Sequence, residues 1–159
     1  MGQRNSHFVL FLQLGRVESI CLIDFQISRI ASPVLDIAYL LYTSTTKETR
    51  DNHYHDLIRD YYDELTCTLS ALGCEPRDIV SWSVLQDQLK MYSRYGLGMA
   101  LVTLPLFLTD SSEIVNMDEA MDEDESFLAI YGNSDTSSLD ACKKRTSDVL
   151  EDCIQLGQL

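Results

Sequence analysis

Two short apolar runs near the start of the chain predict a β-hairpin. The first extends from Phe8 to Leu14, the second from Val17 to Ile23, and Gly15-Arg16 lies between them. Both runs are rich in Val, Ile, Leu and Phe, and a two-residue break that contains Gly is typical of a tight turn between antiparallel strands. We therefore expect a hairpin over residues 8–23.

After the predicted hairpin, the apolar residues follow the spacing that is typical of helices. Ser32-Pro33 favours a helix start, with Ser32 as N-cap and Pro33 at the first helical position. Apolar residues cover nearly all sides of the helix that follows, so we expect it to be buried; they are Val34, Leu35, Ile37, Ala38, Leu40 and Leu41. Asp36 lies inside this helix, about one turn from its start, and its carboxylate needs the N-terminal amides or a neighbouring loop as partner.

A long helix is predicted from Lys47 to Leu72. Gly73 is expected as its C-cap, and Pro76 prevents it from continuing. Its apolar residues include a stripe with a spacing of four and three further residues beside it: Leu57, Tyr61, Leu65 and Leu69, with Tyr54, Ile58 and Tyr62. We interpret the tyrosines as packing at the edge of the core rather than as ligand contacts.

A further helix is predicted to be capped by Ser83. The apolar run from Tyr95 to Thr109 either extends that helix or forms a separate buried helix broken at Pro105. This run has 15 residues, fewer than the roughly 20 that a membrane span needs. We therefore expect a soluble protein with a helical core over residues 32–109.

The segment 110–135 contains nine acidic residues and no Lys or Arg. This composition favours a solvated surface loop. Calcium binding is the alternative, but Phe127 stands where an EF-hand loop that began at Asp122 would need Gly.

A final helix is predicted within residues 138–157. Its apolar stripe consists of Val149, Leu150, Cys153, Ile154 and Leu156. Lys143-Lys144-Arg145 lies near its start, where cations oppose the helix dipole, so we expect another contact to hold them.

Composition and charge narrow the possible functions. The chain has 159 residues, 45% hydrophobic and 23% charged, which is typical of one globular domain. Its formal charge of -13 disfavours nucleic acid and anionic membranes as partners. The five cysteines are odd in number and form no CxxC pair. We therefore expect reduced thiols and a cytoplasmic location rather than a disulfide framework or a zinc site.

Few residue patterns in the chain indicate a catalytic or ligand-binding site. The chain contains no phosphate-binding glycine loop, no GxSxG elbow and no HExxH motif. His53 and His55 are two apart on the long helix and point in different directions, so exposed histidines are favoured over a metal site. Asp24 follows the second predicted strand, either as an ordinary strand-terminating residue or as a ligand in an active site.

Two neighbouring stretches together resemble the ecdysteroid kinase-like (CHK kinase-like) family. They are CLIDFQISR at Cys21–Arg29 and SPVLDIAYLLYTS at Ser32–Ser44. That family belongs with the aminoglycoside and choline kinases, which share the protein-kinase-like fold. Tyr95–Leu101, Pro105 and Asp148–Asp152 also resemble its C-terminal half, so the resemblance covers roughly residues 17–159.

The resemblance implies a fold, an activity and roles for two carboxylates. The implied fold is mostly α with an N-terminal β-hairpin, the C-lobe of a protein-kinase-like α+β fold whose N-lobe is absent. The implied activity is phosphorylation of a small-molecule alcohol, such as a steroid, with ATP and Mg²⁺ as cofactors. Asp24 takes the place of the metal-binding Asp of the DFG-like segment, so it would contact Mg²⁺ and the nucleotide phosphates. Asp36 matches the helix acid that braces the catalytic loop by hydrogen bonds.

The chain departs from the family before the hairpin. An HGDxWxxN-like loop, which supplies the catalytic base and a second metal-binding Asn, is expected there, with the Asn near His7 or Phe8. Neither Asn5 nor His7 lies in such a motif, and the nucleotide-binding lobe with its Lys is missing. We therefore expect a fragment or a degenerate paralogue with little or no activity alone.

Two alternatives stay open. In the first, the chain is a non-catalytic interaction module whose protein partner binds the face that the missing lobe exposes. In the second, it is an unrelated helical domain, in which Asp24 and Asp36 lie far apart rather than beside one cleft.

Overall fold

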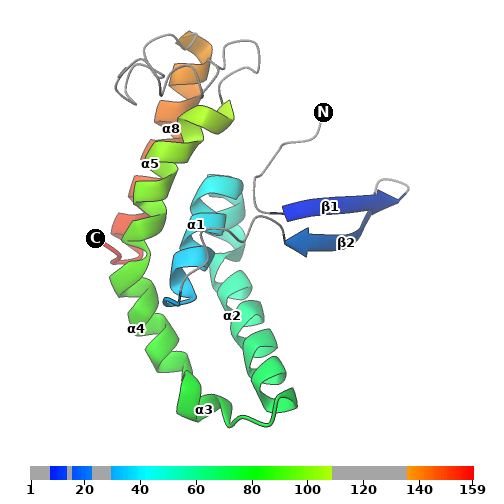
Figure 1. The fold of residues 1–159 in the computed structure, drawn as a ribbon. Coiled ribbons are helices and arrows are strands. Elements are labelled where there is room, and N and C mark those ends of the chain that lie inside the picture. Colours follow the sequence, from blue (N-terminus) through cyan, green and yellow to red (C-terminus); the bar gives the residue numbers. More distant parts are fainter. Residues whose placement is uncertain (1–7, 14–15, 23–29, 109–135) are drawn as a thin grey trace, which may run out of the picture. The chain divides into compact units, whose positions relative to one another are not determined.

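The computed structural model describes residues 8–13, 16–22, 30–108 and 136–159 (Figure 1). The chain divides into two units, residues 1–31 and residues 32–159, and each is described by itself. The first contains two strands and the second contains the described helices. The prediction of a mostly helical chain is confirmed.

Two antiparallel strands form the first unit. They are β1 (Phe8–Gln13) and β2 (Arg16–Leu22), and they agree with the two apolar runs of the sequence. Phe8 pairs with Leu22, and the register is irregular between Phe11 and Leu12. Such an irregularity bends a strand and increases its twist.

The second unit contains six described helices. They are α1 (Val34–Ser44), α2 (Lys47–Ala71), α3 (Pro76–Ile79), α4 (Trp82–Tyr92), α5 (Arg94–Leu108) and α8 (Thr136–Gln155). Helix α5 packs against both α1 and α8, and α8 lies alongside it (Figure 1). The most deeply buried large side chains of this core are Tyr42, Ile58, Leu85, Leu104 and Val149.

Helix α2 begins and ends where the sequence predicts. Its N-cap is Thr46, whose hydroxyl accepts a hydrogen bond from the Thr49 N–H at 3.2 Å. At the other end Gly73 has φ +80°, a left-handed conformation that Gly adopts without a Cβ clash. The Cys74 N–H then bonds the Leu69 carbonyl at 3.0 Å, which completes a Schellman motif.

The inward face of α2 differs from the predicted stripe. Leu57 is 38% exposed, whereas Tyr54 and Ile58 are buried. Arg50, one turn before Tyr54, is buried as well, with 3% of its surface exposed. The buried face therefore follows the spacing Arg50, Tyr54, Ile58, and it includes a charge that the apolar pattern does not register.

Helix α1 is buried on one side only, which corrects the expectation of burial all round. Val34, Ala38 and Leu41 face the core, whereas Leu40 is 47% exposed. Asp36 is also exposed. The reason is that α1 packs mainly against α5 and, less extensively, against α4. Neighbours on one side leave the opposite side of a helix open whatever its hydrophobicity.

Helices α4 and α5 are separate, and α4 starts earlier than predicted. Ser81, not Ser83, caps α4, because its hydroxyl accepts a hydrogen bond from the Val84 N–H at 3.3 Å. Helix α5 contains Pro105 without ending there. One side of α5 is exposed rather than buried: Leu101 is 53% exposed, whereas Ala100 and Leu104 are buried.

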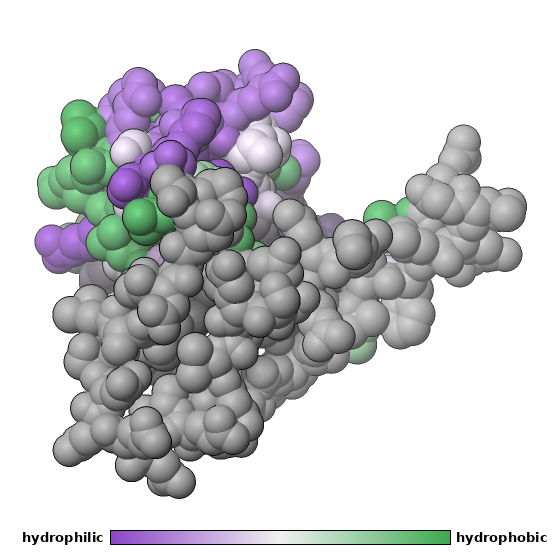
Figure 2. Space-filling view, turned by 90° about the horizontal axis from the view of Figure 1, so that it is seen from above, coloured by the Kyte–Doolittle hydropathy of each residue, from purple (hydrophilic) through white to green (hydrophobic). Residues whose placement is uncertain are grey.

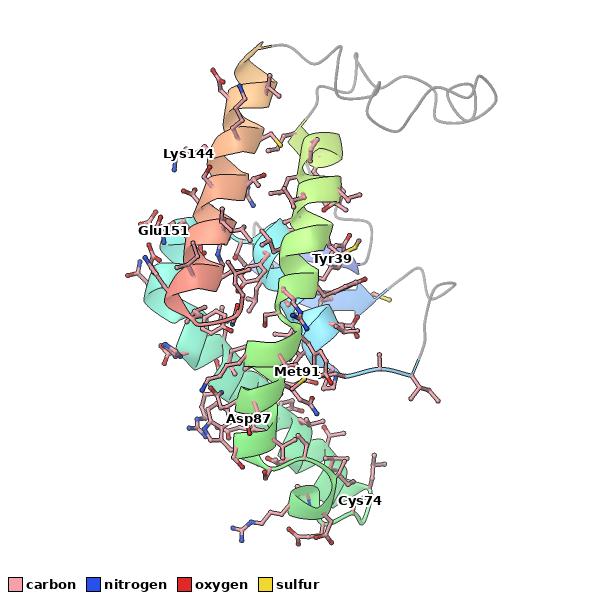
Figure 3. All side chains as sticks on the ribbon, turned by 90° about the vertical axis from the view of Figure 1, so that its left-hand side faces the viewer. Tyr39, Cys74, Asp87, Met91, Lys144 and Glu151 are labelled. Carbon is pink, nitrogen blue, oxygen red and sulfur yellow. The ribbon has the colours of Figure 1, made fainter. Side chains whose placement is uncertain are left out.

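Helix α8 directs only part of its predicted stripe inward. Val149 and Cys153 are fully buried, but Leu150 is 42% and Ile154 is 62% exposed. Lys144 and Glu151 project on the side away from α5 (Figure 3). Seen from above, hydrophobic and hydrophilic surface lie side by side on the helical unit (Figure 2). None of the described helices is long and apolar enough to span a bilayer.

Candidate functional site

The start of α1 is held by the side chain of Ser32. Its hydroxyl accepts a hydrogen bond from the Val34 N–H at 3.2 Å and donates one to Gln88 Oε1 of α4 at 2.7 Å. The helix is assigned from Val34, so Pro33 rather than Ser32 occupies the formal N-cap position. Ser32 nevertheless supplies the capping oxygen, as the sequence predicts, because it satisfies an N–H of the first turn.

Asp36 lies in the first turn of α1 with its side chain exposed. Negative charge is favoured at this end of a helix by the aligned peptide dipoles. The charge of Asp36 also acts on Tyr61 of α2. Burial raises the pKa of the Tyr61 hydroxyl, and the negative charge of Asp36 raises it further. Its exposure removes the desolvation cost that we expected it to carry.

Asp24 lies in the segment 23–29, outside the described residues. Its position relative to Asp36 is therefore not part of the structure, and the expectation that both carboxylates flank one cleft stays a prediction.

The two histidines of α2 do not form a metal cluster. His53 and His55 are both exposed, and Tyr54 between them is buried. This agrees with the interpretation of them as surface residues. Over residues 30–108 and 136–159, no three His, Cys, Asp or Glu side chains gather closely enough to hold a metal ion.

The end of α1 is held by Arg145 of α8. One guanidinium nitrogen, Nη2, donates to the carbonyls of Thr43 at 3.2 Å and of Thr45 at 3.0 Å. These carbonyls belong to the last turn of α1, where a positive charge is favoured by the helix dipole. For Arg145, the contact that we expected is therefore the C-terminus of another helix, whereas Lys143 and Lys144 pair with Asp140 and Asp148 of α8.

Gln158 joins α1 to α2 in the interior. The Tyr42 hydroxyl donates to Gln158 Oε1, and Gln158 Nε2 donates to the Tyr54 hydroxyl at 2.9 Å. Burial raises the pKa of Tyr42 well above its ordinary value, and the neighbouring Cys153 adds to the rise. Burial raises the pKa of Tyr54 too. Both phenols therefore stay neutral, as their interior positions require.

A buried ionic group lies next to these tyrosines. Asp152 of α8, 4% exposed, accepts a hydrogen bond from Arg50 Nε at 2.5 Å and one from Lys47 Nζ at 2.8 Å. Arg50 also donates through Nη1 to the Thr45 carbonyl at 2.8 Å. The hydrogen bonds that Lys47 donates to Asp152 and Asp51 raise the pKa of Lys47, so its ammonium form persists. We call Lys47, Arg50, Asp152 and Gln158 the C-terminal anchor, because they attach the end of the chain to α2.

No local pattern in the sequence predicts the C-terminal anchor. Arg50 and Asp152 are 102 positions apart, and a single sequence does not pair residues at that separation. The one available signal was the spacing of four from Arg50 through Tyr54 to Ile58, which places a cation on the buried face of α2.

The comparisons with known proteins give one match. Residues 9–74 match the sequence model of the ecdysteroid kinase-like family. The match supports membership of the chain in that family. No curated protein and no solved structure matches the chain.

The matched region contains both carboxylates named from the sequence. Asp24 and Asp36 lie inside residues 9–74. It also covers β1, β2, α1 and α2, whereas Gln88, Arg145 and Asp152 lie beyond it. The similarity to the ecdysteroid kinase-like family thus lies in the hairpin and the first two helices.

Proposed function

We propose that this chain forms part of a small-molecule kinase of the ecdysteroid kinase-like family, and that Asp24 binds the Mg²⁺ that accompanies ATP. The match over residues 9–74, which includes Asp24 and Asp36, is the observation that carries the proposal. The acceptor is a hydroxyl group of a small molecule, such as a steroid alcohol. The five cysteines are odd in number and form no CxxC pair, which fits a reducing compartment, so we place the protein in the cytoplasm.

The donor chemistry of Asp24 fits this role. Carboxylate oxygens are the ligands that Mg²⁺ prefers in proteins, usually together with phosphate oxygens and water. When bound, Mg²⁺ neutralises charge on the phosphates during phosphoryl transfer. The contribution of Asp24 is therefore one negatively charged oxygen donor, and Asn at this position would offer a neutral oxygen without the charge.

Asp36 has a different role in the proposal. Its exposed carboxylate in the first turn of α1 can accept hydrogen bonds from backbone N–H groups of a neighbouring segment. In the family this segment is the catalytic loop. We therefore treat Asp36 as a residue that orders the active site rather than one that contacts the nucleotide.

The 159-residue chain by itself is proposed to transfer little or no phosphate. No stretch of it resembles the HGDxWxxN-like loop that supplies the base in this family. Positioning and charge neutralisation carry most of the catalysis in phosphoryl transfer. A chain that contributes only one of the metal-binding groups is expected to bind Mg²⁺·ATP weakly and to turn over slowly.

The test uses the purified chain and a fluorescent ATP analogue. The proposal predicts binding that requires Mg²⁺, together with phosphotransfer to water or to added alcohols that stays at background. Binding that is unchanged by a chelator would contradict the metal-dependent site. Transfer well above background would contradict the low activity of the chain alone.

Exposed apolar residues favour a second candidate function, a non-catalytic interaction module. Leu150 and Ile154 are adjacent on one face of α8 and are 42% and 62% exposed. Leu101 on α5 is 53% exposed. Replacing Ile154 with Glu is expected to abolish a partner interaction through α8 without changing Mg²⁺-dependent nucleotide binding. If Ile154→Glu weakened the partner interaction and nucleotide binding equally, the result would count against two separate functions.

A further inference from the structure

We propose that the connection from α2 to α4 is a docking surface for a basic, amphipathic segment of another protein. The surface consists of residues 72–84, which include helix α3 and the start of α4, and we call it the α2–α4 tip. Helix α3 lies at one end of the helical unit, where α2 ends and α4 begins (Figure 1). Most of the tip lies beyond the region 9–74 that matches the family. The inference goes beyond the proposed function, because it concerns a contact with a protein and not the nucleotide site.

Three large apolar side chains of the tip are exposed. Leu72 is 73%, Ile79 is 56% and Val84 is 43% exposed. They belong to one short connection, so they are exposed at the same end of the helical unit. Single apolar residues are common on protein surfaces, whereas a group of them at one place marks an interaction site.

Trp82, the only tryptophan of the chain, lies next to these residues and is partly buried. The guanidinium carbon of Arg59 is 3.6 Å from the centre of a Trp82 ring, and Tyr62 meets the edge of Trp82 with ring centres 5.2 Å apart. Trp, Tyr and Arg are the side chains that dominate binding free energy at protein interfaces. The tip therefore combines exposed apolar residues with the residue types of an interface centre.

Backbone hydrogen bonds order the tip before any partner binds. The Val80 N–H donates to the Pro76 carbonyl at 2.8 Å, and the Asp78 N–H donates to the Glu75 carbonyl at 3.1 Å. The Schellman motif at Gly73 fixes the other end of the connection. An ordered surface loses less conformational entropy on association, which favours binding.

The charges around the tip favour a basic partner. Residues 59–87 contain six carboxylates but only two cations, Arg59 and Arg77. All six carboxylates are exposed, and the ion pairs of the described residues involve other side chains; the six are Asp60, Asp63, Glu64, Glu75, Asp78 and Asp87. A partner that carries Lys and Arg around its apolar side chains matches this pattern.

A second copy of the chain does not match it. A symmetric contact between two tips would place carboxylates against carboxylates. Each chain also has a formal charge of -13, so two copies repel one another. Like charges brought together at an interface cost free energy, and the occupant is therefore a different protein.

The experiment titrates the full chain with three synthetic peptides that lack aromatic residues. The first is an amphipathic helix of Leu and Lys, the second replaces its Lys with Glu, and the third replaces its Leu with Ser. Trp82 emission reports occupation of the tip, because no other tryptophan contributes. Calorimetry gives the dissociation constant, and sedimentation measures self-association of the chain alone.

Two pairs of variants locate the binding site. Ile79→Ser removes an apolar side chain from the tip, and Leu101→Ser makes a comparable change on α5, where Leu101 is 53% exposed. The combined Glu75→Gln, Asp78→Asn variant removes two charges from the tip. Its control removes one Glu and one Asp charge from α8 through Glu151→Gln and Asp140→Asn. Circular dichroism shows that each variant is folded, and Leu72→Ser takes the place of Ile79→Ser if that variant does not fold.

We expect the Leu and Lys peptide to bind and to shift the Trp82 emission to shorter wavelength, as water leaves the indole. Ile79→Ser should weaken binding roughly fivefold or more, as the loss of an interface anchor implies. The charge variant of the tip should weaken it roughly twofold to fivefold and reduce its dependence on salt. Both controls and the other two peptides decide specificity: the controls should bind like the unmodified chain, and the peptides should bind at least roughly tenfold more weakly.

The other outcomes overturn the inference. Equal binding of the Ser and Lys peptide would mean that net charge alone attracts it, and equal binding of the Leu and Glu peptide would exclude a basic partner. Equal effects of Ile79→Ser and Leu101→Ser, or no binding of the first peptide, would show that the tip is not a docking surface. Self-association that Ile79→Ser abolishes would identify a second copy as the occupant. None of these results bears on Mg²⁺-dependent nucleotide binding, so the proposed function is tested separately.

Discussion

Gly96 of α5 lies directly against the backbone of Ala38 in α1. A Cβ atom added at Gly96 would stand 2.6 Å from the Ala38 carbonyl oxygen and 2.8 Å from its Cβ atom. Both distances are far shorter than van der Waals contact. The absence of a side chain at Gly96 is therefore what allows α5 to approach the helix that carries Asp36.

Gly96→Ala is expected to destabilise the protein by about 2 kcal/mol, because overpacking against backbone atoms forces the helices apart. Urea unfolding followed by circular dichroism measures the change. Gly98→Ala is the matched control, since nothing lies within 4 Å of its added Cβ. Alanine is the better helix former, so this variant should gain up to about 1 kcal/mol. Equal behaviour of the two variants would show that the close approach at Gly96 is wrong.

Asp152→Asn should be among the most damaging single changes in the chain. It removes the negative charge that pairs with Arg50, whose side chain is buried. An uncompensated buried charge costs about 3 kcal/mol or more. Glu151→Gln, next in sequence but 53% exposed, should change the free energy of unfolding by less than about 0.5 kcal/mol. A small effect of Asp152→Asn in the same urea experiment would contradict a buried anchor.

Stability should fall in alkaline solution because of the buried tyrosines. Burial raises the pKa of Tyr42, so the folded chain keeps this phenol protonated at a pH where the unfolded chain, with a pKa of about 10, releases the proton. The unfolded state then binds fewer protons, and the free energy of unfolding decreases as the pH rises. The stabilisation that comes from burying the neutral phenol of Tyr42 is fully present below about pH 10 and is lost progressively as the pH rises above that value.

At pH 10.5 this linkage amounts to about 1 kcal/mol for Tyr42. The urea midpoint should therefore be lower at pH 10.5 than at pH 7.5, and Tyr42→Phe should make that drop smaller. Tyr92→Phe, at a position that is 38% exposed, serves as control and should keep the full drop. A drop that is the same in both variants would mean that Tyr42 does not titrate as its burial requires.

Local signals in the sequence predicted the elements well. Gly73 and Pro76 placed the end of α2 to within one residue, because a left-handed Gly and a Pro stop a helix through their own backbone geometry. The capping oxygen of Ser32 was also found from the residues nearest to it. Such features depend on neighbours in the chain, so one sequence is enough to recognise them.

Contacts between distant segments were not predicted. Leu40 and Ile154 fit an inward apolar pattern, yet both are exposed, because the available neighbours cover only one side of each helix. The bond between Gln88 and Ser32 joins positions 56 apart, and nothing in either segment identifies the other. Asp24 and Asp36 were singled out by their positions after a predicted strand and inside a predicted helix, but the roles assigned to them came from resemblance to a family. Their roles therefore require an experiment on the protein.

The most direct measurement of the proposed site is a Mg²⁺ titration of fluorescent ATP analogue binding by the unmodified chain and by Asp24→Asn. Asp87→Asn, an exposed carboxylate on α4 outside the matched region, is the control for lost negative charge (Figure 3). We predict at least roughly tenfold weaker Mg²⁺-dependent binding for Asp24→Asn, as expected for the loss of an anionic metal ligand, and unchanged binding for Asp87→Asn. Equal binding by Asp24→Asn and the unmodified chain would contradict the assignment of Asp24 as the metal ligand.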